Sequence, residues 1–586
     1  MEDHEKGREA FADDETYRLH ALRHSTAHIM AEAIATVFPG AKFAFGPPVE
    51  DGFYYDVDVS RPIQEGDLSA IEDAMRAVVK RNSPFVRKDV TREEAEVLFA
   101  DQPFKLERIA GLDGGLTVYD QGGFTDLCRG PHVPRTGNAK HFKLMKVAGA
   151  YWLGDAKNKQ LQRVYGTVWP TREALDQYLF RLEEAKKRDH RTVGRQMGLF
   201  MTHEFAPGAT FWLPKGEVLY HTLSEAMRTL LLAEGYVAVK TPMLFEKSLW
   251  ECSGHWAHYR ENMFKVEKHE EGEEAGRTYA LKPMNCPSHM LIFKNTKRSY
   301  RELPLRIHDQ GVLHRDEVKG ALGGLTRVRQ FAQDDGHLFM MEEQIEGEVT
   351  ALIQLINRVY SALGLGFKAK LSTRPADKLG DDALWDRAEE ALRNALVTNG
   401  LEYQVNAGDG AFYGPKIDYD VIDALGRPWQ CATIQLDYQV PLKFELSYVG
   451  ADNADHPPVV IHRAIFGSFE RFIGILIEHF AGAFPAWMAP EQVRVMSVSE
   501  KSEAWGNTVT EALKAAGVRV HFDSRDDKIG AKIREAHNAK PVWYAVVGER
   551  DQENGTVSVK SRDADLGALP LAEFVARVVA ESKAPF

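Results

Sequence analysis

Residues 313–339, LHRDEVKGALGGLTRVRQFAQDDGHLF, contain two alternating runs separated by a glycine-rich segment. Arg315 and Glu317 lie two positions apart, and Arg327, Arg329 and Phe331 repeat that spacing. Side chains two apart on a strand face the same side, so the segment predicts a hairpin with its charges on one face. An arginine fork suits phosphate, a carboxylate accepts from an amino group, and an aromatic ring stacks on a base. The alternative is a salt-bridged surface hairpin, the commoner explanation of an isolated Arg-x-Glu.

The rest of the chain predicts several domains, since 586 residues correspond to about four domains of roughly 150 residues each. Helix-like patterns first alternate with the strand-like runs FYYDVDV and AYWLGDA. Residues 172–189 carry leucines at helical spacing and predict an amphipathic linker helix. A large block over 196–485 mixes helices with strands such as RPWQCATIQLDYQV. After Pro490 the strands VRVMSVS, GVRVHFD, VWYAVVG and GTVSVKS, separated by the helices TVTEALKAAG and KIGAKIREAHN, predict a compact mixed α/β domain.

The composition is typical of globular domains, with 44% hydrophobic and 27% charged residues. No apolar run reaches the roughly 18 residues that suggest a membrane span, and the acidic start, MEDHEKGREAFADDE, is unlike a signal or transit peptide. Four scattered cysteines do not make a disulfide framework. We therefore expect a cytoplasmic enzyme with no membrane association. The net charge of −12 argues mildly against nonspecific coating of nucleic acid.

A second feature lies near the start, in RHSTAHIMAEAIATVFPG (23–40). His24 and His28 share one face of the predicted helix, as in the zinc pair of a metalloprotease, but that motif requires Glu where this chain has Ser25. TDLCRGPHVPRTG later adds Cys128 and His132. Three imidazoles and a thiol form a plausible four-ligand zinc set, and the same groups can instead activate water.

The predicted hairpin resembles motif 2 of class II aminoacyl-tRNA synthetases. GSFERFIGILIEHFAG (467–482), with Arg471 opening a mostly buried helix, resembles motif 3, and the helix predicted over 217–234 with the following YVAVKTPML resembles motif 1, the dimer-interface element. KPMNCPSHM, QDDGHLF, GAFYGPKID and VIHRAIFGSFERF are similar to the core of threonyl-tRNA synthetases, and the similarity runs from about residue 20 to the C-terminus. The resemblance implies an α/β multidomain fold with four parts: an α+β editing domain (1–170), a linker helix (171–195), a class II antiparallel-sheet catalytic core (196–487) and a C-terminal mixed α/β anticodon-binding domain (488–586).

The resemblance also implies the activity. A homodimer would activate L-threonine with ATP to threonyl-adenylate and transfer it to the 3′ end of tRNA(Thr), with Mg²⁺ accompanying ATP. It implies one catalytic zinc per subunit, held by Cys286, His337 and His462. Each ligand alone reads as an ordinary buried residue, yet together one thiolate and two imidazoles leave a zinc position open. An apolar pocket separates threonine from valine only about a hundredfold, whereas a metal ligated by the side-chain hydroxyl rejects valine.

The resemblance assigns the remaining roles in the catalytic core as follows. The ATP-binding residues are Arg315, Glu317, Arg327, Phe331, Gln430 and Arg471. The threonine-binding residues are Asp335, Tyr413 and Gln435. The catalytic residues are Arg315, Glu317, Arg471, Lys416 and, near the tRNA terminus, His255.

Zinc ligation does not exclude serine, which differs from threonine by one methyl group worth roughly 1–3 kcal/mol. A second, hydrolytic site for mischarged seryl-tRNA(Thr) is therefore expected, and HxxxH with CxxxH resembles the editing domain shared by threonyl- and alanyl-tRNA synthetases. In the alanyl relatives this group binds zinc, and in the threonyl enzymes it is metal-free; we favour the metal-free interpretation. The implied editing residues are His24, His28, Lys105, Asp126, Cys128 and His132.

At the C-terminus, SRDDKIGAKIREA (524–536) resembles the anticodon-binding domain, and we expect it to bind tRNA. The helix predicted in this segment carries a local basic patch formed by Lys528, Lys532 and Arg534. A solvent-exposed helix face is the usual explanation of such a patch. Bacterial relatives often have Asn at position 526 and Arg at position 560. We therefore assign no anticodon contact to Asp526, Asp551 or Lys560.

Two other functional classes are weighed against this interpretation. A catalytically silent relative that binds tRNA or a messenger leader would be expected to lose parts of motif 2, motif 3 or the zinc set. A free-standing editing hydrolase would have no synthetase core. The commonest bacterial layout also has a small ubiquitin-like domain ahead of the editing domain; since the editing motif begins here by residue 23, we expect that domain to be missing or split off.

Overall fold

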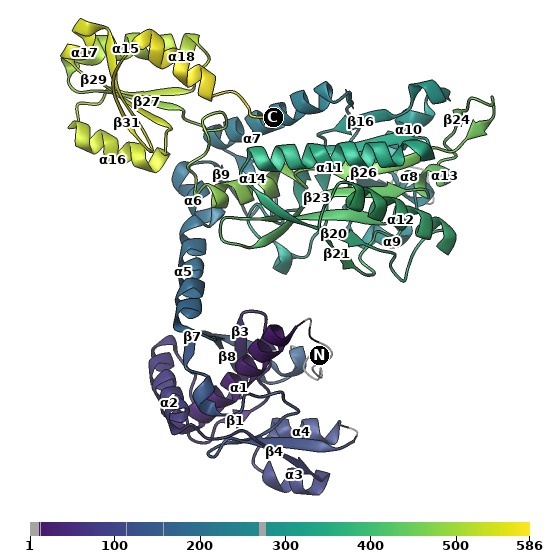
Figure 1. Ribbon diagram of the computed structural model, residues 1–586, viewed down its shortest axis with the longest axis vertical. Coiled ribbons are helices and arrows are strands. Elements are labelled where there is room, and N and C mark those ends of the chain that lie inside the picture. Colours follow the sequence, from purple (N-terminus) through teal and green to yellow (C-terminus); the bar gives the residue numbers. More distant parts are fainter. Residues whose placement is uncertain (1–10, 12, 113, 156, 269–276) are drawn as a thin grey trace. The chain divides into compact units, whose positions relative to one another are not determined.

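The computed structural model describes residues 11, 13–112, 114–155, 157–268 and 277–586. The chain forms two compact units, Met1–Glu183 and Glu184–Phe586. The division falls within helix α5 (Arg172–Arg188), which confirms the helix predicted over 172–189 (Figure 1). Within the described part of the chain, no helix has both the length and the apolar character required to cross a membrane.

The first unit is built around helix α1 (Asp14–Val37), which confirms the helix predicted over 23–40. The Asp13 side chain accepts a hydrogen bond of 2.7 Å from the Thr16 N–H and caps the first turn. The stretch 21–34 is buried throughout, because α1 packs against α2 (Leu68–Arg81) and against strands of a five-stranded sheet. The predicted co-facial histidines therefore lie inside the unit.

This sheet is antiparallel, with the order β1-β3-β8-β7 and with β2 paired to β3. Strand β3 confirms the strand predicted at FYYDVDV. The strand predicted at AYWLGDA is wrong beyond Tyr151, because the chain turns at Trp152–Gly154 and buries Trp152 against Phe104. The strands of the sheet are β1 (Lys42–Phe43), β2 (Pro48–Val49), β3 (Gly52–Asp58), β7 (His141–Tyr151) and β8 (Gln160–Trp169).

A three-stranded antiparallel sheet completes the first unit, with two short helices beside it. Thr91 and Glu94 form a capping box that begins one of these helices, since each side chain bonds the other's backbone N–H. The elements are β4 (Val86–Val90), α3 (Arg92–Leu98), α4 (Pro103–Ala110), β5 (Leu116–Asp120) and β6 (Thr125–Leu127).

The second unit contains an eight-stranded sheet of order β11-β16-β19-β26-β23-β22-β20-β21. The six strands from β16 to β20 are paired antiparallel, and only the two edge pairs are parallel. The strand predicted at RPWQCATIQLDYQV is confirmed by β23. The strands are β11 (Val237–Ala238), β16 (Leu305–Asp309), β19 (Asp335–Met340), β20 (Gly366–Ser372), β21 (Tyr403–Asn406), β22 (Lys416–Ile422), β23 (Pro428–Asp437) and β26 (Val459–Ala464).

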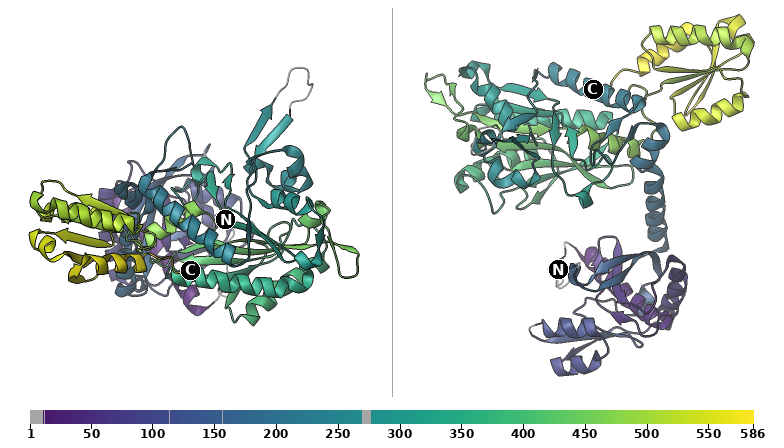
Figure 2. Two further views of the ribbon diagram at one scale, coloured as in Figure 1. Left: turned by 90° about the horizontal axis from the view of Figure 1, so that it is seen from above. Right: turned by 180° about the vertical axis from the view of Figure 1, so that it is seen from behind.

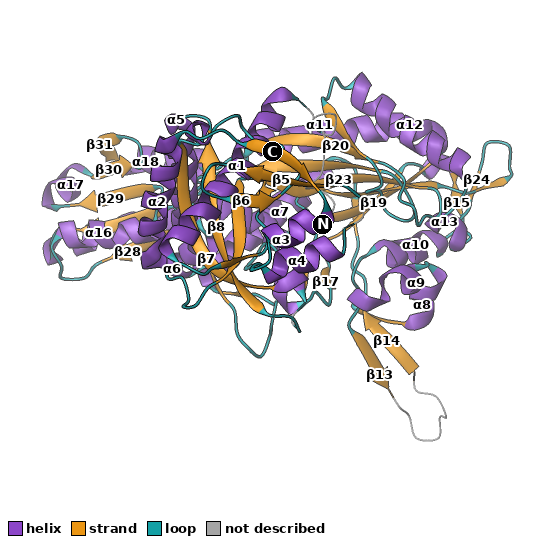
Figure 3. Ribbon diagram, turned by 90° about the horizontal axis from the view of Figure 1, so that it is seen from below, coloured by secondary structure: helices purple, strands orange, loops and turns teal. Residues whose placement is uncertain are grey.

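Helices α11 (Ile345–Ala362) and α12 (Asp382–Thr398) pack against each other and against this sheet. The predicted helix over 217–234 is confirmed as α7 (Pro214–Ala233), with a proline at its first position, where no N–H bond is lost. The mostly buried helix predicted in 467–482 is confirmed as α14 (Phe469–His479). Beyond the sheet, β13 (Lys265–Lys268) and β14 (Arg277–Leu281) form a projecting antiparallel ribbon (Figure 3).

The hairpin predicted in 313–339 forms, but it is shorter than predicted. Its paired strands are β17 (Val312–His314) and β18 (Gln330–Ala332), so Arg315, Glu317 and Arg327 lie in the connecting segment. Arg315 still donates its N–H to the carbonyl of Arg329 at 2.8 Å. The strand alternation therefore extends one residue past the ladder and then gives way to a loop rich in glycine, which can take conformations that end pairing.

The C-terminal part has a five-stranded sheet of order β28-β27-β29-β30-β31 with helices on both faces (Figure 2). All four predicted strands and both predicted helices are confirmed. The predicted basic patch is wrong at Lys532, which is 1% exposed and donates to the carbonyls of Ser497 at 2.8 Å and Asp523 at 3.2 Å. The elements are β27 (Val493–Ser497), α15 (Glu503–Ala515), β28 (Val520–Asp523), α16 (Ile529–Ala539), β29 (Trp543–Val547), α17 (Glu549–Asn554), β30 (Thr556–Ser561), β31 (Asp565–Pro570) and α18 (Leu571–Glu581).

Candidate active sites

One row of side chains crosses four neighbouring strands of the eight-stranded sheet. The register places His337 directly opposite His462, His462 opposite Gln435, and Gln435 opposite Lys416. Directly opposed residues on antiparallel strands share a face. Four of the residues singled out in the sequence are thus aligned by strand pairing alone, although they come from distant parts of the chain.

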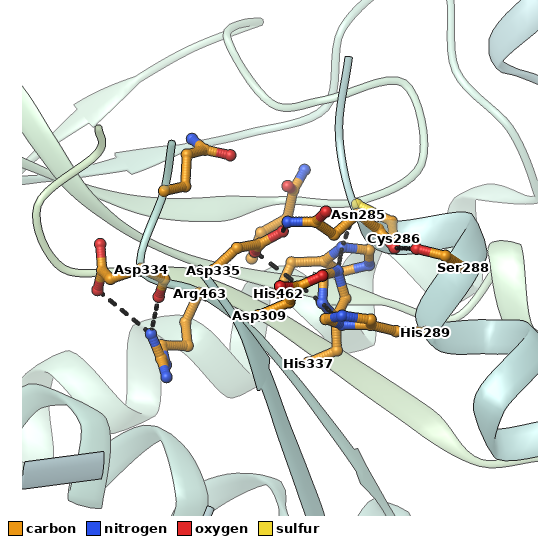
Figure 4. A network of polar contacts seen from close by, with 12 residues as sticks. Asn285, Cys286, Ser288, His289, Asp309, Asp334, Asp335, His337, His462 and Arg463 are labelled. Atoms are coloured by element: carbon orange, nitrogen blue, oxygen red, sulfur yellow. Dashed lines mark hydrogen bonds and ion pairs between the residues drawn. The ribbon is translucent and has the colours of Figure 1, made fainter. Parts of the chain in front are cut away.

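Helix α10 (Cys286–Lys294) brings the thiol of its first residue to this row (Figure 4). The Sγ of Cys286 lies 3.2 Å from Nδ1 of His462, and Nε2 of His337 lies 2.9 Å from the same nitrogen. All three side chains are buried, and one ligand atom from each lies within 4.8 Å of the others. A thiol and two imidazoles at these separations match the donor types and spacing of a three-ligand zinc site with an open position.

The unused ring nitrogens of both histidines are also bonded. Nε2 of His462 lies 2.8 Å from Oδ2 of Asp437, and Nδ1 of His337 lies 2.7 Å from Nδ1 of His289. Such outer partners fix the tautomer and ring orientation of metal-ligating histidines. The residues present therefore fit zinc. Sequence reasoning missed both partners, although His289 stands three positions after Cys286 in KPMNCPSHM.

Polar groups for an amino acid border this cluster. Asp335, two positions before His337 on β19, accepts a 3.0 Å hydrogen bond from Asn285, and burial raises its pKa to about 6. The Tyr413 hydroxyl lies 3.1 Å from Oε1 of Gln435, and the Tyr413 ring lies 5.2 Å from that of His462. The three residues predicted to bind threonine are therefore grouped around the thiol–imidazole cluster.

His255 lies beside the same group. It is 1% exposed, and its ring stands edge-on to Phe412 at 5.5 Å and tilted toward Tyr413 at 6.1 Å. Its Nδ1 lies 2.8 Å from the Ser253 hydroxyl, while its Nε2 has no hydrogen-bond partner among the described residues. Burial lowers the pKa of His255 to about 3, so the imidazole is neutral and one ring nitrogen remains available.

A cleft of about 600 Å³ opens next to this cluster and is lined by all six residues predicted to bind ATP. Ser468 caps the first turn of α14 by accepting the backbone N–H of Arg471. In the Arg471 side chain, Nε donates to the carbonyl of Thr326 at 2.9 Å, and a terminal nitrogen donates to the carbonyl of Gln430 at 3.1 Å. The lining includes Arg315, Glu317, Arg327, Phe331, Lys416, Gln430, Gln435 and Arg471.

The cleft carries an excess of positive charge. Burial lowers the pKa of Arg471, and the nearby Arg315 and Arg327 guanidinium groups lower it further. Three cations that repel one another in a partly buried cleft are stabilised by an anion placed between them. Arg315 also lies over the Phe331 ring, 5.0 Å from its centroid, which sets an aromatic face beside the charges.

Acidic partners hold Arg327 and Lys416 of the cleft in place. Glu317 accepts hydrogen bonds from Arg327 at 2.9 and 3.1 Å. Nζ of Lys416 lies 2.8 Å from Oδ2 of Asp418, whose other oxygen accepts from Gln430 at 2.8 Å. The salt-bridged alternative for the hairpin therefore holds for the Glu317–Arg327 pair, and both side chains still line the cleft.

The second candidate site lies within the first unit. Sγ of Cys128 lies 3.3 Å from Nε2 of His24 and 3.1 Å from Nε2 of His132. With His28, one ligand atom from each of the four residues lies within 4.8 Å of the others. His24, His28 and Cys128 line a pocket together with Lys105 and Asp126. Helix α1, helix α4, strand β6 and the loop after β6 thus bring together all six residues predicted for hydrolysis.

The electrostatics of this second site favour neutral imidazoles. Burial lowers the pKa of His28 to about 4 and that of His132 well below its ordinary value, and burial raises the pKa of Cys128 to about 12. A neutral imidazole can accept a proton from water, whereas a protonated thiol is a poor nucleophile. Nε2 of His28 lies 3.7 Å from Oδ2 of Asp126.

Asp126 belongs to a buried network that the sequence did not reveal. Its carboxylate pairs with Lys105 and accepts a 2.5 Å hydrogen bond from the Tyr55 hydroxyl, which in turn accepts from Lys105 at 3.0 Å. Tyr55 lies in the β3 run, where an alternating strand gives no sign of a polar role. A buried Lys–Asp pair with a bridging hydroxyl keeps the carboxylate ionised beside the histidines.

Models of known families match three parts of the chain. A model described as "tRNA synthetase class II core domain (G, H, P, S and T)" matches residues 264–480. "Anticodon binding domain" matches residues 492–581. "Threonyl and Alanyl tRNA synthetase second additional domain" matches residues 116–165. The eight-stranded sheet with its arginine-lined cleft is thus the core of a class II aminoacyl-tRNA synthetase.

Individual relatives narrow this class. Threonine–tRNA ligase of Anaeromyxobacter dehalogenans (strain 2CP-1) is 52% identical over 97% of this chain and 89% of its own length. That of Symbiobacterium thermophilum is 50% identical over 98% of this chain and 87% of its own length. The solved RNA binding domain of threonyl-tRNA synthetase from Cryptosporidium parvum Iowa II is 41% identical, with a TM-score of 0.65 over 67% of this chain and 98% of that domain. The chain belongs to the threonine–tRNA ligase family.

Proposed function

We propose that this protein is a threonine–tRNA ligase: it activates threonine with ATP and transfers the threonyl group to the 3′ end of tRNA(Thr). The observation that carries the proposal is the continuity between the arginine-lined cleft and the thiol–imidazole cluster, which share Gln435 and Lys416 in one row across the sheet. A polyanion bound in the cleft would hold its reacting phosphorus beside an amino acid bound at the cluster.

In this arrangement the chain acts mainly by positioning and by charge stabilisation. Arg315 and Arg471 bind the triphosphate, and Phe331 stacks on the adenine. Arg327, Glu317 and Gln430 complete the nucleotide contacts, and Lys416 stabilises the charge that develops as the threonine carboxylate attacks. Mg²⁺ accompanies the triphosphate. His255 would assist the later transfer, because its neutral Nε2, which has no partner among the described residues, can accept a proton from the attacking ribose hydroxyl.

Zinc, one ion per subunit, would be held by Cys286, His337 and His462, with Asp437 and His289 orienting the two imidazoles. When bound, it supplies a Lewis-acid position that only an amino acid with a side-chain hydroxyl can ligate. Asp335 holds the amino group, and Tyr413 and Gln435 border the side chain. This donor set explains how threonine is separated from the nearly isosteric valine.

An ATP–pyrophosphate exchange assay with threonine, serine and valine tests the proposal. We expect strong exchange with threonine, measurable exchange with serine and almost none with valine. Cys286→Ser should lose threonine-dependent exchange together with bound metal, as measured by elemental analysis, while Cys252→Ser, which changes an exposed cysteine of the same unit, should retain both. Exchange that is equal for threonine and valine would contradict the zinc-based selection.

A second activity is proposed for the first unit: hydrolysis of seryl-tRNA(Thr). His24, His28 and His132 would position and deprotonate water, and the Lys105–Asp126 pair would bind the charged and hydroxyl groups of the mischarged end. The neutral imidazoles and the protonated thiol support water activation over nucleophilic attack by Cys128. We retain the metal-free interpretation; two zinc ions per chain in elemental analysis would overturn it.

We propose an editing domain over 1–170, a catalytic core over 196–487 and an anticodon-binding domain over 488–586, assembled as a homodimer through α7 and the strand after it. The predicted linker helix over 171–195 is divided at Asp189 into α5 and the start of α6. In the C-terminal domain Lys528 and Arg534 are exposed, and Asp551 accepts bonds from Gly548, Thr556 and Ser558 within its own fold. Asp551 is therefore better explained as a structural residue than as an anticodon contact.

A further inference from the structure

His190 lies at the start of helix α6 (His190–Met197), directly after the linker helix α5 and outside every set of residues assigned above. It is 4% exposed. Its Nδ1 lies 2.7 Å from Oε1 of Glu478, in the last turn of α14, and its backbone N–H donates to the same oxygen at 3.1 Å. Its Nε2 accepts a 2.9 Å hydrogen bond from the backbone N–H of Leu325. One imidazole therefore joins α6, α14 and the glycine-rich loop of the hairpin.

The partners define the state of this imidazole. A backbone N–H is only a donor, so Nε2 of His190 must present its lone pair to Leu325. The proton of the neutral ring must then sit on Nδ1, where Glu478 accepts it. Both nitrogens are in use, and so the cluster of Asp189, His190 and Glu478 offers no free imidazole lone pair to a metal ion, although its ligand atoms lie close together.

The bond to Leu325 sits next to a contact of the nucleotide cleft. Leu325 is fully buried, and the following residue, Thr326, accepts the Nε hydrogen bond of Arg471 through its carbonyl at 2.9 Å. The nitrogen of Leu325 and the carbonyl carbon of Thr326 each lie two backbone bonds from the peptide bond that joins the two residues. Fixing the Leu325 N–H therefore restricts the direction in which the Thr326 C=O points.

The loop has little freedom to adjust around His190. Gly324 has φ of +57°, and a Cβ at that position would lie 2.2 Å from Nε2 of His190. Only glycine allows the loop to approach the imidazole this closely in this conformation. The close approach and the hydrogen bond to Leu325 together hold the glycine-rich loop against α6.

We propose that His190 is a positioning residue of the nucleotide site: it holds Leu325 so that the Thr326 carbonyl keeps Arg471 directed into the cleft. The proposal rests on the assignment of that cleft to ATP. It predicts that loss of the Nε2 acceptor weakens ATP binding, whereas loss of the Nδ1 donor mainly weakens the fold.

Two amide variants separate the two ring nitrogens. In His190→Asn the side-chain amide reaches the position of Nδ1 and can donate to Glu478, but nothing reaches Leu325. In His190→Gln the longer side chain can place its carbonyl oxygen near the position of Nε2 and accept from Leu325, but the bond to Glu478 is lost. Each variant removes one hydrogen bond, and His521→Asn, on an exposed histidine, serves as the matched control.

The measurement is ATP–pyrophosphate exchange at saturating threonine, with melting temperatures of all variants. We expect the KM for ATP to rise about tenfold in His190→Asn, the equivalent of about 1.4 kcal/mol, which lies within the cost of leaving a buried donor unpaired. In His190→Gln the KM for ATP should stay within about threefold of the wild-type value. The KM for threonine should stay within about twofold of the wild-type value in both variants.

These measurements separate a failure of the proposed function from a failure of the role given to His190. If the wild-type enzyme shows no threonine-dependent exchange, the proposed threonine–tRNA ligase function is refuted. An active enzyme in which His190→Asn keeps the original KM for ATP would refute the role of His190 alone. Equal rises in both variants, or parallel rises of KM for ATP and threonine, would show that His190 is only a structural residue.

Discussion

At the scale of single residues, burial decides which chemistry each cluster can perform. His28, His132, His255 and His337 are all held neutral because desolvation penalises the charged ring. Neutral imidazoles are suited to binding a metal or accepting a proton, and the two clusters differ in what surrounds those rings. The cluster of the second unit opens onto a wide cleft, whereas the cluster of the first unit lies beside a buried Lys–Asp pair and a smaller pocket.

Asp437→Asn tests the outer partner of the metal site. Oδ1 of Asp437 accepts from the backbone N–H groups of Gln439 and Val440, which an asparagine oxygen can still do, while Oδ2 faces His462. Loss of that carboxylate should lower zinc affinity about 10- to 100-fold. Competition with a chromophoric chelator measures the affinity, with the exposed Asp452→Asn as control. Zinc affinity equal to that of the control would contradict the orienting role.

The combined variant His24→Ala, His28→Ala tests the hydrolytic site. Threonine activation should stay within about twofold, since these residues belong to the other compact unit. Deacylation of preformed seryl-tRNA should fall about 10²- to 10⁴-fold, the usual contribution of general acid–base groups, and seryl-tRNA should accumulate. His141→Ala, in the same unit, is the control. Equal deacylation rates would show that the histidines are structural, and loss of threonine activation would show that they support the fold.

At the scale of secondary-structure elements, α14 connects the hairpin to the nucleotide cleft. Glu470 accepts the backbone N–H of Ala332 in β18 at 3.0 Å, and the next residue, Arg471, holds the loop through Thr326. Adjacent residues of one helix turn therefore bind a strand and a loop of the same hairpin. Because Glu470 is buried without a cationic partner among the described residues, its charge is costly.

This cost predicts a pH-dependent stability. Burial raises the pKa of Glu470 to about 7 from an unfolded value near 4.5. The folded chain therefore binds more protons than the unfolded chain between these values, so this group lowers stability as pH rises from about 4.5 to 7. Glu470→Gln keeps a hydrogen-bond acceptor without the charge. The substitution should raise the free energy of unfolding at pH 8 by about 1–3 kcal/mol, which is seen as a higher melting temperature. At pH 4.5 the melting temperature should change little. An equal effect at both pH values would contradict this account.

At the scale of the whole molecule, the C-terminal domain should contribute tRNA affinity without taking part in activation. The charge reversals Lys528→Glu and Arg534→Glu, on exposed side chains, should weaken tRNA binding severalfold and reduce its salt dependence, and leave ATP–pyrophosphate exchange unchanged. Filter binding at two salt concentrations measures this. Lys532→Met, at the buried lysine of the same helix, should instead lower the melting temperature. Unchanged tRNA affinity in the charge-reversal variant would remove this face from the proposed interface.

Assembly is the second prediction at this scale. The helix α7 and the strand after it resemble motif 1, the element through which class II enzymes pair, and so we expect a dimer of the 65.9 kDa chain. Sedimentation at micromolar concentration measures the mass. A fully active monomer would exclude the dimer as a requirement of the site.

Local spacing along the chain was enough to predict the elements with strong periodicity and to identify the chemical groups. The amphipathic pattern of residues 172–189, the alternating runs after residue 490 and the histidines four apart on one face all depend on local spacing, which the printed chain already contains. The motif resemblances likewise indicated which thiol, imidazoles and arginines to expect. The periodic patterns and the motifs are both properties of residues that are close together in the sequence.

Features that depend on contacts between distant residues could be seen only in the folded chain. Cys286 and His462 are 176 positions apart and are joined only by strand register and by the start of α10. The outer partners Asp437 and His289, the bridge of His190 to Leu325, and the burial of Lys532 leave no local pattern, because each arises where separate elements pack. The hairpin ladder also ended earlier than its alternation predicted, since pairing requires a partner strand and alternation does not.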